Sequence, residues 1–233
     1  MPERGSERPG ERAPLSRERV LRGALAVADA SGIAALTIRS IARELGVKPM
    51  SLYYYVTGKD EILGGIVDLV FSEIELPSAG GDWQSEMRRR AISVRRVLRR
   101  HPWAIGLLES RINPGTATLR HHDATIATLR AAGFSVAMTA HAYALLDSYV
   151  YGFALQEASL PFNPQTAAAL AERTSQQISA RRYPHLVEMA TEHILQPGYD
   201  PGNEFEIGLS VILDALARSI PGNRELPSFT PSS

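Results

Sequence analysis

The stretch from Thr37 to Lys59 constrains the fold of this chain more than any other, and it reads TIRSIARELGVKPMSLYYYVTGK. Apolar residues at three- and four-residue spacing predict a helix over 37–45, which the Thr37 hydroxyl can cap. Gly46 supplies the left-handed turn at which that helix ends. A second short helix is expected over 50–56. Two short helices around a glycine are typical of a helix-turn-helix, in which the second helix meets the major groove of DNA.

The second helix should bury only Leu52 and Val56 and present its other side chains outward. Lysine heads and tyrosine or serine hydroxyls donate to phosphate oxygens, while apolar side chains and rings contact thymine methyl groups. Three consecutive tyrosines exceed what a core needs, although the alternative is a small three-helix domain whose tyrosines cover its own interior. The residues predicted to contact DNA are Arg39, Lys48, Met50, Ser51, Tyr53, Tyr54, Tyr55 and Lys59.

The distribution of charge supports this prediction better than the total does. The chain has 25 basic and 25 acidic side chains, yet residues 13–59 hold seven basic side chains against three acidic ones, a net charge of +4. A local positive field steers binding to phosphate. Residues 1–14 alternate arginine with glutamate and are rich in Pro and Gly, so we expect a disordered tail. An arginine arm in the minor groove is the alternative.

The segment LTIRSIARELGVKPMSLYYYVTGKDEIL resembles the DNA-binding half of the TetR family of bacterial repressors, and the similarity spans roughly Leu15 to Ile74. The remainder is more loosely similar to the sensor domain of the tetracycline repressor and its relatives, through Asp82-Trp83-Gln84, the turn at 132–135 and the helix around 205–209. The resemblance implies an all-α regulator. Its expected parts are an N-terminal three-helix helix-turn-helix DNA-binding domain over 15–76 and a C-terminal helical ligand-binding and dimerisation domain over 83–220.

Helical patterns continue beyond the turn-forming boundary at 77–82, and no alternating strand pattern appears. A fourth helix with apolar residues over 62–74 should contact both domains and is our candidate for the lever between them. Residues 221–233 read as a Pro- and Ser-containing tail. Further helices are predicted over 83–100, 102–110, 116–132, 135–159, 164–180, 184–195 and 203–219.

Two of these helices are candidates for dimerisation. Ser135–Ser159 is apolar almost all round, and Asn203–Ser219 carries an apolar side. Together they have a larger apolar surface than the fold of a single chain can bury. In the family the matching pair joins its twin in a four-helix interface. Two probe helices one DNA turn apart, ~34 Å, would read a palindrome. The arginines over 88–100 are interpreted as a solvated helix face rather than a second nucleic-acid site.

Relatives bind a small molecule inside the helical domain, and polar groups on its helices suggest anchors for one. For each of these groups the alternative is structural: tyrosines that bond across a dimer interface, and an Asp147 that pairs with an arginine. The predicted pocket residues are Arg90, Val94, Trp103, Leu107, Arg111, Tyr143, Asp147 and Gln156.

The resemblance does not extend to the metal-bound drug of the tetracycline repressor. Aligned without gaps, the drug-contact positions fall on Ser72, Arg90, Val94, Leu108 and Gln156, which lack the ligands that magnesium prefers. We therefore expect no metal, no cofactor and no response to magnesium–tetracycline.

Other classes of protein are disfavoured. The chain has no cysteine, which excludes disulfides and zinc–thiolate sites, and its six histidines form no catalytic motif. His121-His122-Asp123 would face three directions on a helix. No long apolar run or signal peptide is present, so we expect a cytoplasmic protein without a membrane partner. The expected function is a homodimeric repressor that a small molecule releases from a palindromic DNA operator. The alternatives are a constitutive DNA-binding protein or activator without an effector, and an enzyme fused to a DNA-binding domain.

Overall fold

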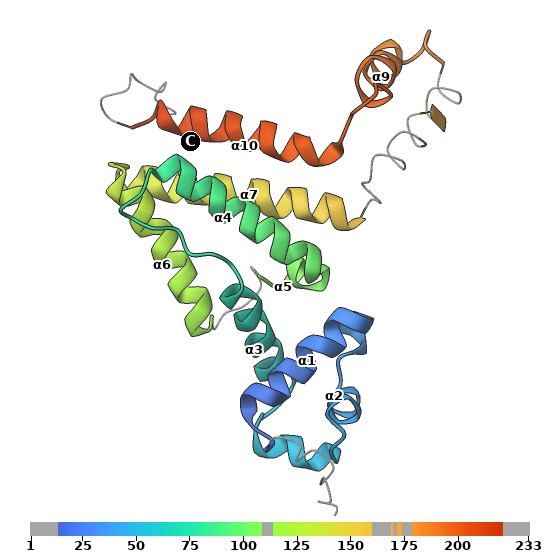
Figure 1. Cartoon of the computed structure of the whole chain (residues 1–233), viewed down its shortest axis with the longest axis vertical. Coiled ribbons are helices and arrows are strands. Elements are labelled where there is room, and N and C mark those ends of the chain that lie inside the picture. The colour runs from blue at the N-terminus through green and yellow to red at the C-terminus, as the bar shows by residue number, and fades with distance from the viewer. Residues whose placement is uncertain (1–13, 109–113, 160–168, 170–171, 174–178, 221–233) are drawn as a thin grey trace, which may run out of the picture.

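A computed structural model describes residues 14–108, 114–159, 169, 172–173 and 179–220, and every regular element in these ranges is a helix (Figure 1). The all-α prediction is therefore confirmed. The elements are α1 (Arg17–Ser31), η1 (Ile33–Ala35), α2 (Ile38–Leu45), η2 (Pro49–Tyr54), α3 (Lys59–Ser72), α4 (Trp83–Arg100), η3 (Pro102–Ala104), α5 (Ile105–Leu108), α6 (Thr116–Ala131), α7 (Val136–Ser159), α9 (Pro184–Met189), η4 (Ala190–Ile194) and α10 (Pro201–Ala217).

Local sequence signals fix the helices of the N-terminal domain. Ser16 caps α1 by accepting from the Arg19 N–H, and Thr37 caps α2 by accepting from the Ser40 N–H at 3.0 Å. Gly46 ends α2 with φ 67° and ψ 37°, the left-handed conformation that the sequence predicts. The predicted Thr37 cap and the predicted turn at Gly46 are confirmed.

The second helix of the pair differs from the prediction. It is a 3₁₀ helix over Pro49–Tyr54 rather than a helix over 50–56. Six residues close few α-type hydrogen bonds, and short segments of this kind commonly take the tighter 3₁₀ form. Leu52 and Val56 are both buried, as the apolar spacing predicts.

Helix α3 belongs to two hydrophobic cores. Ile62, Leu63 and Ile66 pack with α1, α2 and η2, whereas Val70 and Phe71 pack in the core of the C-terminal body. Figure 1 shows α3 rising from the DNA-binding domain into this body. The expectation that one helix contacts both domains is confirmed by these contacts.

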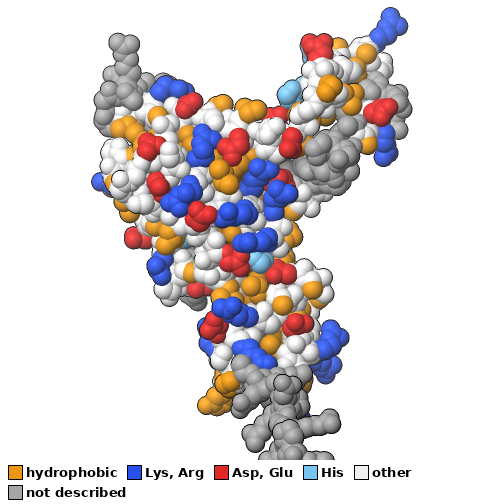
Figure 2. Space-filling view, in the orientation of Figure 1, with side chains coloured by type: hydrophobic (Ala, Val, Ile, Leu, Met, Phe, Trp, Pro, Cys, Tyr) orange, Lys and Arg blue, Asp and Glu red, His pale blue; other side chains and the backbone are white. Residues whose placement is uncertain are grey.

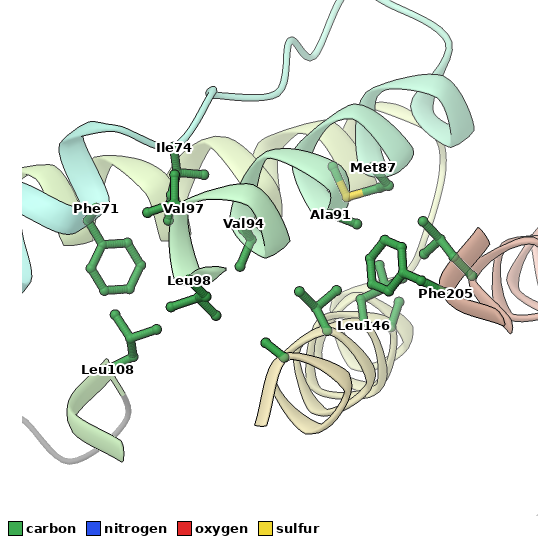
Figure 3. Close-up of a cluster of buried hydrophobic side chains, with 14 of the residues drawn as sticks. Phe71, Ile74, Met87, Ala91, Val94, Val97, Leu98, Leu108, Leu146 and Phe205 are labelled. Atoms are coloured by element: carbon green, nitrogen blue, oxygen red, sulfur yellow. The ribbon is translucent and has the colours of Figure 1, made fainter. Parts of the chain in front are cut away.

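The C-terminal body is built around α4 and α7, with α6 and α10 against them. Its core joins side chains from α3, α4, α5, α6, α7 and α10. Figure 3 shows Phe71, Val94, Leu108, Leu146 and Phe205 converging on it. The predicted helix over 102–110 is divided into η3 and α5, and that over 184–195 into α9 and the π-helical η4. Most of the predicted helix over 164–180, and nearly all of both predicted tails, lie outside the described residues.

In the part of the chain that the structure describes, we find no helix long and apolar enough to cross a membrane.

Candidate DNA-binding face and ligand cavity

The tip of the N-terminal domain is an exposed aromatic and basic surface, which we call the probe face and define by Lys48, Met50, Ser51, Tyr53 and Tyr54. Met50 is 76% exposed and Tyr54 86% exposed, although both are large apolar or aromatic residues. Lys48 and Ser51 are also exposed. An apolar side chain held in water at a domain tip is typical of an interaction site.

The other residues predicted to contact DNA flank the probe face. Arg39 and Lys59 are exposed, and no ion pair to either is found among the described residues. Tyr55 is half-buried and packs against the N-terminal core. Its ring lies edge-to-face against the Tyr54 ring, with 5.0 Å between the ring centroids. Tyr55 therefore supports the outer ring more than it presents a surface of its own.

A carboxylate that the sequence reasoning missed fixes the loop after the probe face. Glu61 Oε2 accepts from the N–H and the hydroxyl of Thr57, at 2.8 and 2.9 Å, and Oε1 accepts from Arg17 Nε at 2.9 Å. The Thr57 N–H and the Arg17 guanidinium lower the pKa of Glu61. These bonds attach the end of η2 to the starts of α3 and α1. The Glu61–Thr57 contact is four residues apart and could have been predicted from spacing, whereas the Arg17 contact could not.

A cavity of about 220 Å³ lies between α3, α6 and α7. Apolar side chains and aromatic rings form most of its wall, and polar atoms come from Thr118, His122 and the two tyrosines. The lining residues are Gly64, Val67, Phe71, Leu108, Pro114, Gly115, Thr118, His122, Tyr143 and Tyr151. Tyr143 hydrogen bonds to His122 Nδ1, and burial, together with the nearby Asp147, raises the pKa of Tyr143.

Behind this cavity lies a buried charged cluster. Arg90 Nη2 donates to Asp147 Oδ1 at 2.6 Å, and Arg90 Nε donates to His121 Nε2 at 3.2 Å. Burial alone lowers the pKa of Arg90, but Asp147 holds it above its ordinary value. Burial and the adjacent Arg90 lower the pKa of His121 to about 3, so this imidazole is neutral. The cluster therefore carries no net charge.

The structure brings together only some of the predicted pocket residues. Tyr143 lines the cavity, with Arg90 and Asp147 directly behind it. The Arg90–Asp147 pair matches the structural alternative for Asp147. Val94 is buried in the core of the body.

The remaining predicted pocket residues lie elsewhere. Trp103 and Leu107 pack against both hydrophobic cores, at the junction of the two domains. Gln156 is exposed beside Leu155 on α7 and does not line the cavity. Arg111 lies outside the described residues. The sequence reasoning missed Thr118 and His122 as cavity residues, because no periodicity indicates which face of α6 meets α3.

Asp68 of α3 caps the N-terminal end of α6, a helix from a later part of the chain. Asp68 Oδ1 accepts from the N–H and the hydroxyl of Thr118, at 2.8 and 3.0 Å, in the first turn of α6. A carboxylate at this end of a helix is favourable because it meets unpaired N–H groups and the positive end of the dipole. Gly115 makes the approach possible, since a Cβ there would lie 2.2 Å from the Asp68 carboxyl carbon.

The arginines of α4 are mostly paired with carboxylates. Figure 2 shows basic and acidic side chains alternating across this face. Four of these pairs have distances of 2.6 to 2.8 Å, and they are Arg88–Glu206, Arg95–Glu157, Arg96–Glu75 and Arg100–Glu73. Arg89 also pairs with Glu75 and Glu86. Charge balance of this kind favours the interpretation of a charged helix face over a second nucleic-acid site.

Helices α7 and α10 each leave large apolar side chains exposed. On α7 these are Val136, Leu145 and Leu155, and on α10 they are Ile207 and Val211. The two helices contact one another. Such faces are typical of surfaces that a second protein chain covers.

Two family models match the chain. Residues 20–66 match the model described as bacterial regulatory proteins of the tetR family, and residues 76–220 match the tetracyclin repressor-like C-terminal domain. Residues 67–75, the end of α3 and the segment directly after it, lie between the two matched ranges.

Similar proteins are found among characterised sequences and solved structures. The HTH-type transcriptional repressor DrrR1 of Streptomyces coeruleorubidus is 31% identical over 217 residues, which cover 89% of this chain and 79% of that protein. Apo ActR from Streptomyces coelicolor has a TM-score of 0.75 and 29% identity, covering 91% of this chain and 99% of that one. ActR in complex with actinorhodin has a TM-score of 0.76 and 28% identity, covering 90% and 98%.

Proposed function

Because the chain belongs to the TetR family of bacterial transcriptional regulators, we propose that it acts as a homodimeric repressor. A small molecule that binds in the cavity between α3, α6 and α7 releases this repressor from DNA. The observation that carries this proposal is the probe face, in which two tyrosines, a methionine, a serine and a lysine are exposed on a helix-turn-helix. The proposal includes no catalytic step, so the effector should be recovered unchanged after binding.

The chemistry of the probe face supports contacts to both bases and phosphates. The lysine heads and the hydroxyls of Ser51 and Tyr53 are suited to phosphate oxygens, which fix the protein on the duplex. Met50 and the Tyr54 ring are suited to apolar contact with thymine methyl groups in the major groove. Glu61 holds the following loop, so that the probe face meets DNA in a fixed orientation.

The exposed faces of α7 and α10 support a dimer. Their apolar side chains lie on adjacent helices, and a second copy of the same pair would bury them in a four-helix interface around a two-fold axis. Such a dimer presents two probe faces to one side of a duplex, which matches a palindromic operator.

The cavity indicates the chemistry of the effector. Burial raises the pKa of Tyr143, so this tyrosine is protonated. The charges of Arg90 and Asp147 cancel, and the cavity walls are largely apolar and aromatic. Burial of an unpaired charge there would be costly. We infer that the effector is an uncharged ring compound with hydroxyl or carbonyl groups that reach His122 and Tyr143. ActR, a relative with a similar fold, was solved with actinorhodin bound.

Magnesium–tetracycline fits this cavity poorly. Within the described part of the chain no group of three or more histidines and acidic residues could hold a metal ion. The positions that correspond to the drug contacts include the apolar Val94 and Leu108. We therefore infer that tetracycline with magnesium leaves the operator complex intact at micromolar drug.

The contact between α3 and α6 provides a route from the cavity to DNA. Both helices line the cavity, and Asp68 joins them beside Gly115 and Thr118. A ligand that separates α6 from α3 would displace the helix whose other end is packed in the DNA-binding domain. The ligand thereby favours an arrangement of the probe faces that does not fit the operator.

Two substitutions test the DNA-binding half of this proposal, on an operator selected from random duplexes with the wild-type protein. Tyr54→Ala should weaken operator binding by about 1–3 kcal/mol and leave non-specific binding almost unchanged, since it removes a contact to bases. Lys59→Ala should weaken all DNA binding and reduce the salt slope by about 1 per protomer. Fluorescence anisotropy at several salt concentrations measures both.

The matched control is Tyr183→Ala, which removes another exposed tyrosine far from the probe face. This variant should bind like the wild type. Wild-type affinity in both Tyr54→Ala and Lys59→Ala would show that the probe face is wrongly assigned.

A further inference from the structure

A polar cluster joins the DNA-binding domain to the C-terminal body at a second place, away from α3. Asp29, in the last turn of α1, accepts at Oδ1 from His101 Nδ1 and from Trp103 Nε1, both at 2.7 Å. Glu73, directly after α3, accepts from Arg100 at 2.6 Å and lies 3.3 Å from His101 Nε2. An ionised carboxylate only accepts, so the His101 ring nitrogen donates to Asp29. We call these five residues the junction cluster.

The junction cluster is held in a packed environment. His101 is only 6% exposed, at the end of α4. Trp103 packs against the hydrophobic cores of both domains, and so does the neighbouring Leu107. Hydrogen bonds to an ionised group are about twice as strong as neutral ones. Asp29 therefore makes two strong, directional bonds to groups that belong to the opposite domain.

The position of the cluster gives it a mechanical consequence. The chain passes from one domain to the other once, through α3. If α3 were the sole connection, the DNA-binding domain could tilt about that helix. The bonds from α1 to His101 and Trp103 form a second attachment beside it, and two attachments fix an orientation that one does not.

We propose that Asp29 is a positioning residue, which sets the orientation of the DNA-binding domain relative to the C-terminal body through its bonds to His101 and Trp103. In a dimer this orientation determines the separation of the two probe faces. The consequence at DNA rests on the proposed function, whereas the orientation within one chain does not.

The orientation can be measured directly, because the natural chain has no cysteine. Cysteines introduced at the exposed Glu44 in α2 and Ala127 in α6 would carry two spin labels per chain. Labelled protein is diluted with unlabelled protein, and pulsed electron spin resonance gives the distance distribution within one chain. Asp29→Asn should broaden or shift this distribution. Trp103→Phe, which keeps a ring but loses the N–H, should act in the same direction.

The control is Glu18→Gln, which removes another α1 carboxylate whose partner, Arg22, lies in the same helix. It should leave the distribution unchanged. Thermal melting confirms that each variant is folded, and Trp103→Phe provides the same test if Asp29→Asn does not fold. The proposal would be overturned if a folded Asp29→Asn or Trp103→Phe variant kept the wild-type distribution of distances between the two spin labels. This outcome does not depend on whether the protein binds DNA.

Operator binding separates orientation from the probe face itself. Asp29→Asn should weaken binding to the selected two-half-site duplex about tenfold, because two loosely oriented probes must be ordered together. Binding to a single half-site should change less than about twofold, since the probe face is intact. An equal loss on both duplexes would mean that Asp29 supports the fold of the domain and not its orientation. Failure of the wild type to bind any duplex would instead contradict the proposed function.

Discussion

At the scale of single residues, burial and charge determine behaviour that residue type alone does not. His121 and His122 are adjacent, yet the first is buried beside Arg90 and the second lines the cavity. The sequence alone does not distinguish the burial of Arg90 from that of the other arginines on α4. In the structure the Arg90 side chain is 1% exposed and forms an ion pair with Asp147. The sequence analysis names Arg90 and Asp147 as candidate pocket residues. The packing of α4 on α7 shows that the two side chains form a pair.

The buried His121 makes stability depend on pH. The unfolded chain binds a proton here near pH 6.5, whereas the folded protein does so only near pH 3. Between these values the unfolded state binds more protons, so the free energy of unfolding falls as pH falls, by up to about 1.4 kcal/mol per pH unit. Urea denaturation between pH 7 and pH 5 should show this slope. His121→Gln should reduce it.

The exposed His185 provides the control for this measurement. His185→Gln should keep the wild-type dependence on pH. The account of His121 fails if the slope survives in His121→Gln.

At the scale of elements, local signals predict where helices begin and end, and they say little about which helices touch. Thr37 and Gly46 act within a few residues of their partners, so the sequence predicts both ends of α2 correctly. The six residues of η2 are too few for their apolar spacing to distinguish an α-helix from a 3₁₀ helix. Contacts such as Asp68–Thr118 join residues 50 positions apart, and no spacing rule reaches that far.

The cap that α3 provides for α6 can be tested by a double-mutant cycle. Asp68→Ala should lower the free energy of unfolding by about 0.5–2 kcal/mol, since it removes a helix cap. Gly115→Ala should also destabilise the protein, because its Cβ meets the Asp68 carboxylate. In the Asp68→Ala background this second cost should largely disappear, which gives a coupling energy.

Gly106→Ala in α5 is the matched control, since nothing lies within 4 Å of its Cβ position. It should cost little or no stability. Additive effects of Asp68→Ala and Gly115→Ala would show that the two sites are independent and that the close approach is not maintained.

At the scale of the whole molecule, the chain is a regulator in which one helix belongs to two cores. The probe face lies at one end, the exposed apolar faces of α7 and α10 proposed for dimerisation lie in the body, and the cavity lies against α3 between them. Resemblance to the TetR family predicts from the sequence that DNA binding belongs to the N-terminal domain and that ligand binding and dimerisation belong to the C-terminal body. The positions of the cavity and of the junction cluster depend on how the helices pack. Of the predicted pocket residues that the structure describes, only Tyr143 lines the cavity.

The most direct test of the account is the dependence of DNA binding on the spacing of the two half-sites. We expect two protomers to bind each selected operator, and an insertion of about five base pairs, half a helical turn, between its half-sites to reduce binding to the non-specific level. The half-turn places one half-site on the opposite side of the duplex from its probe face. Binding by one protomer, or affinity that does not change with the insertion, would contradict a repressor built from two paired probe faces.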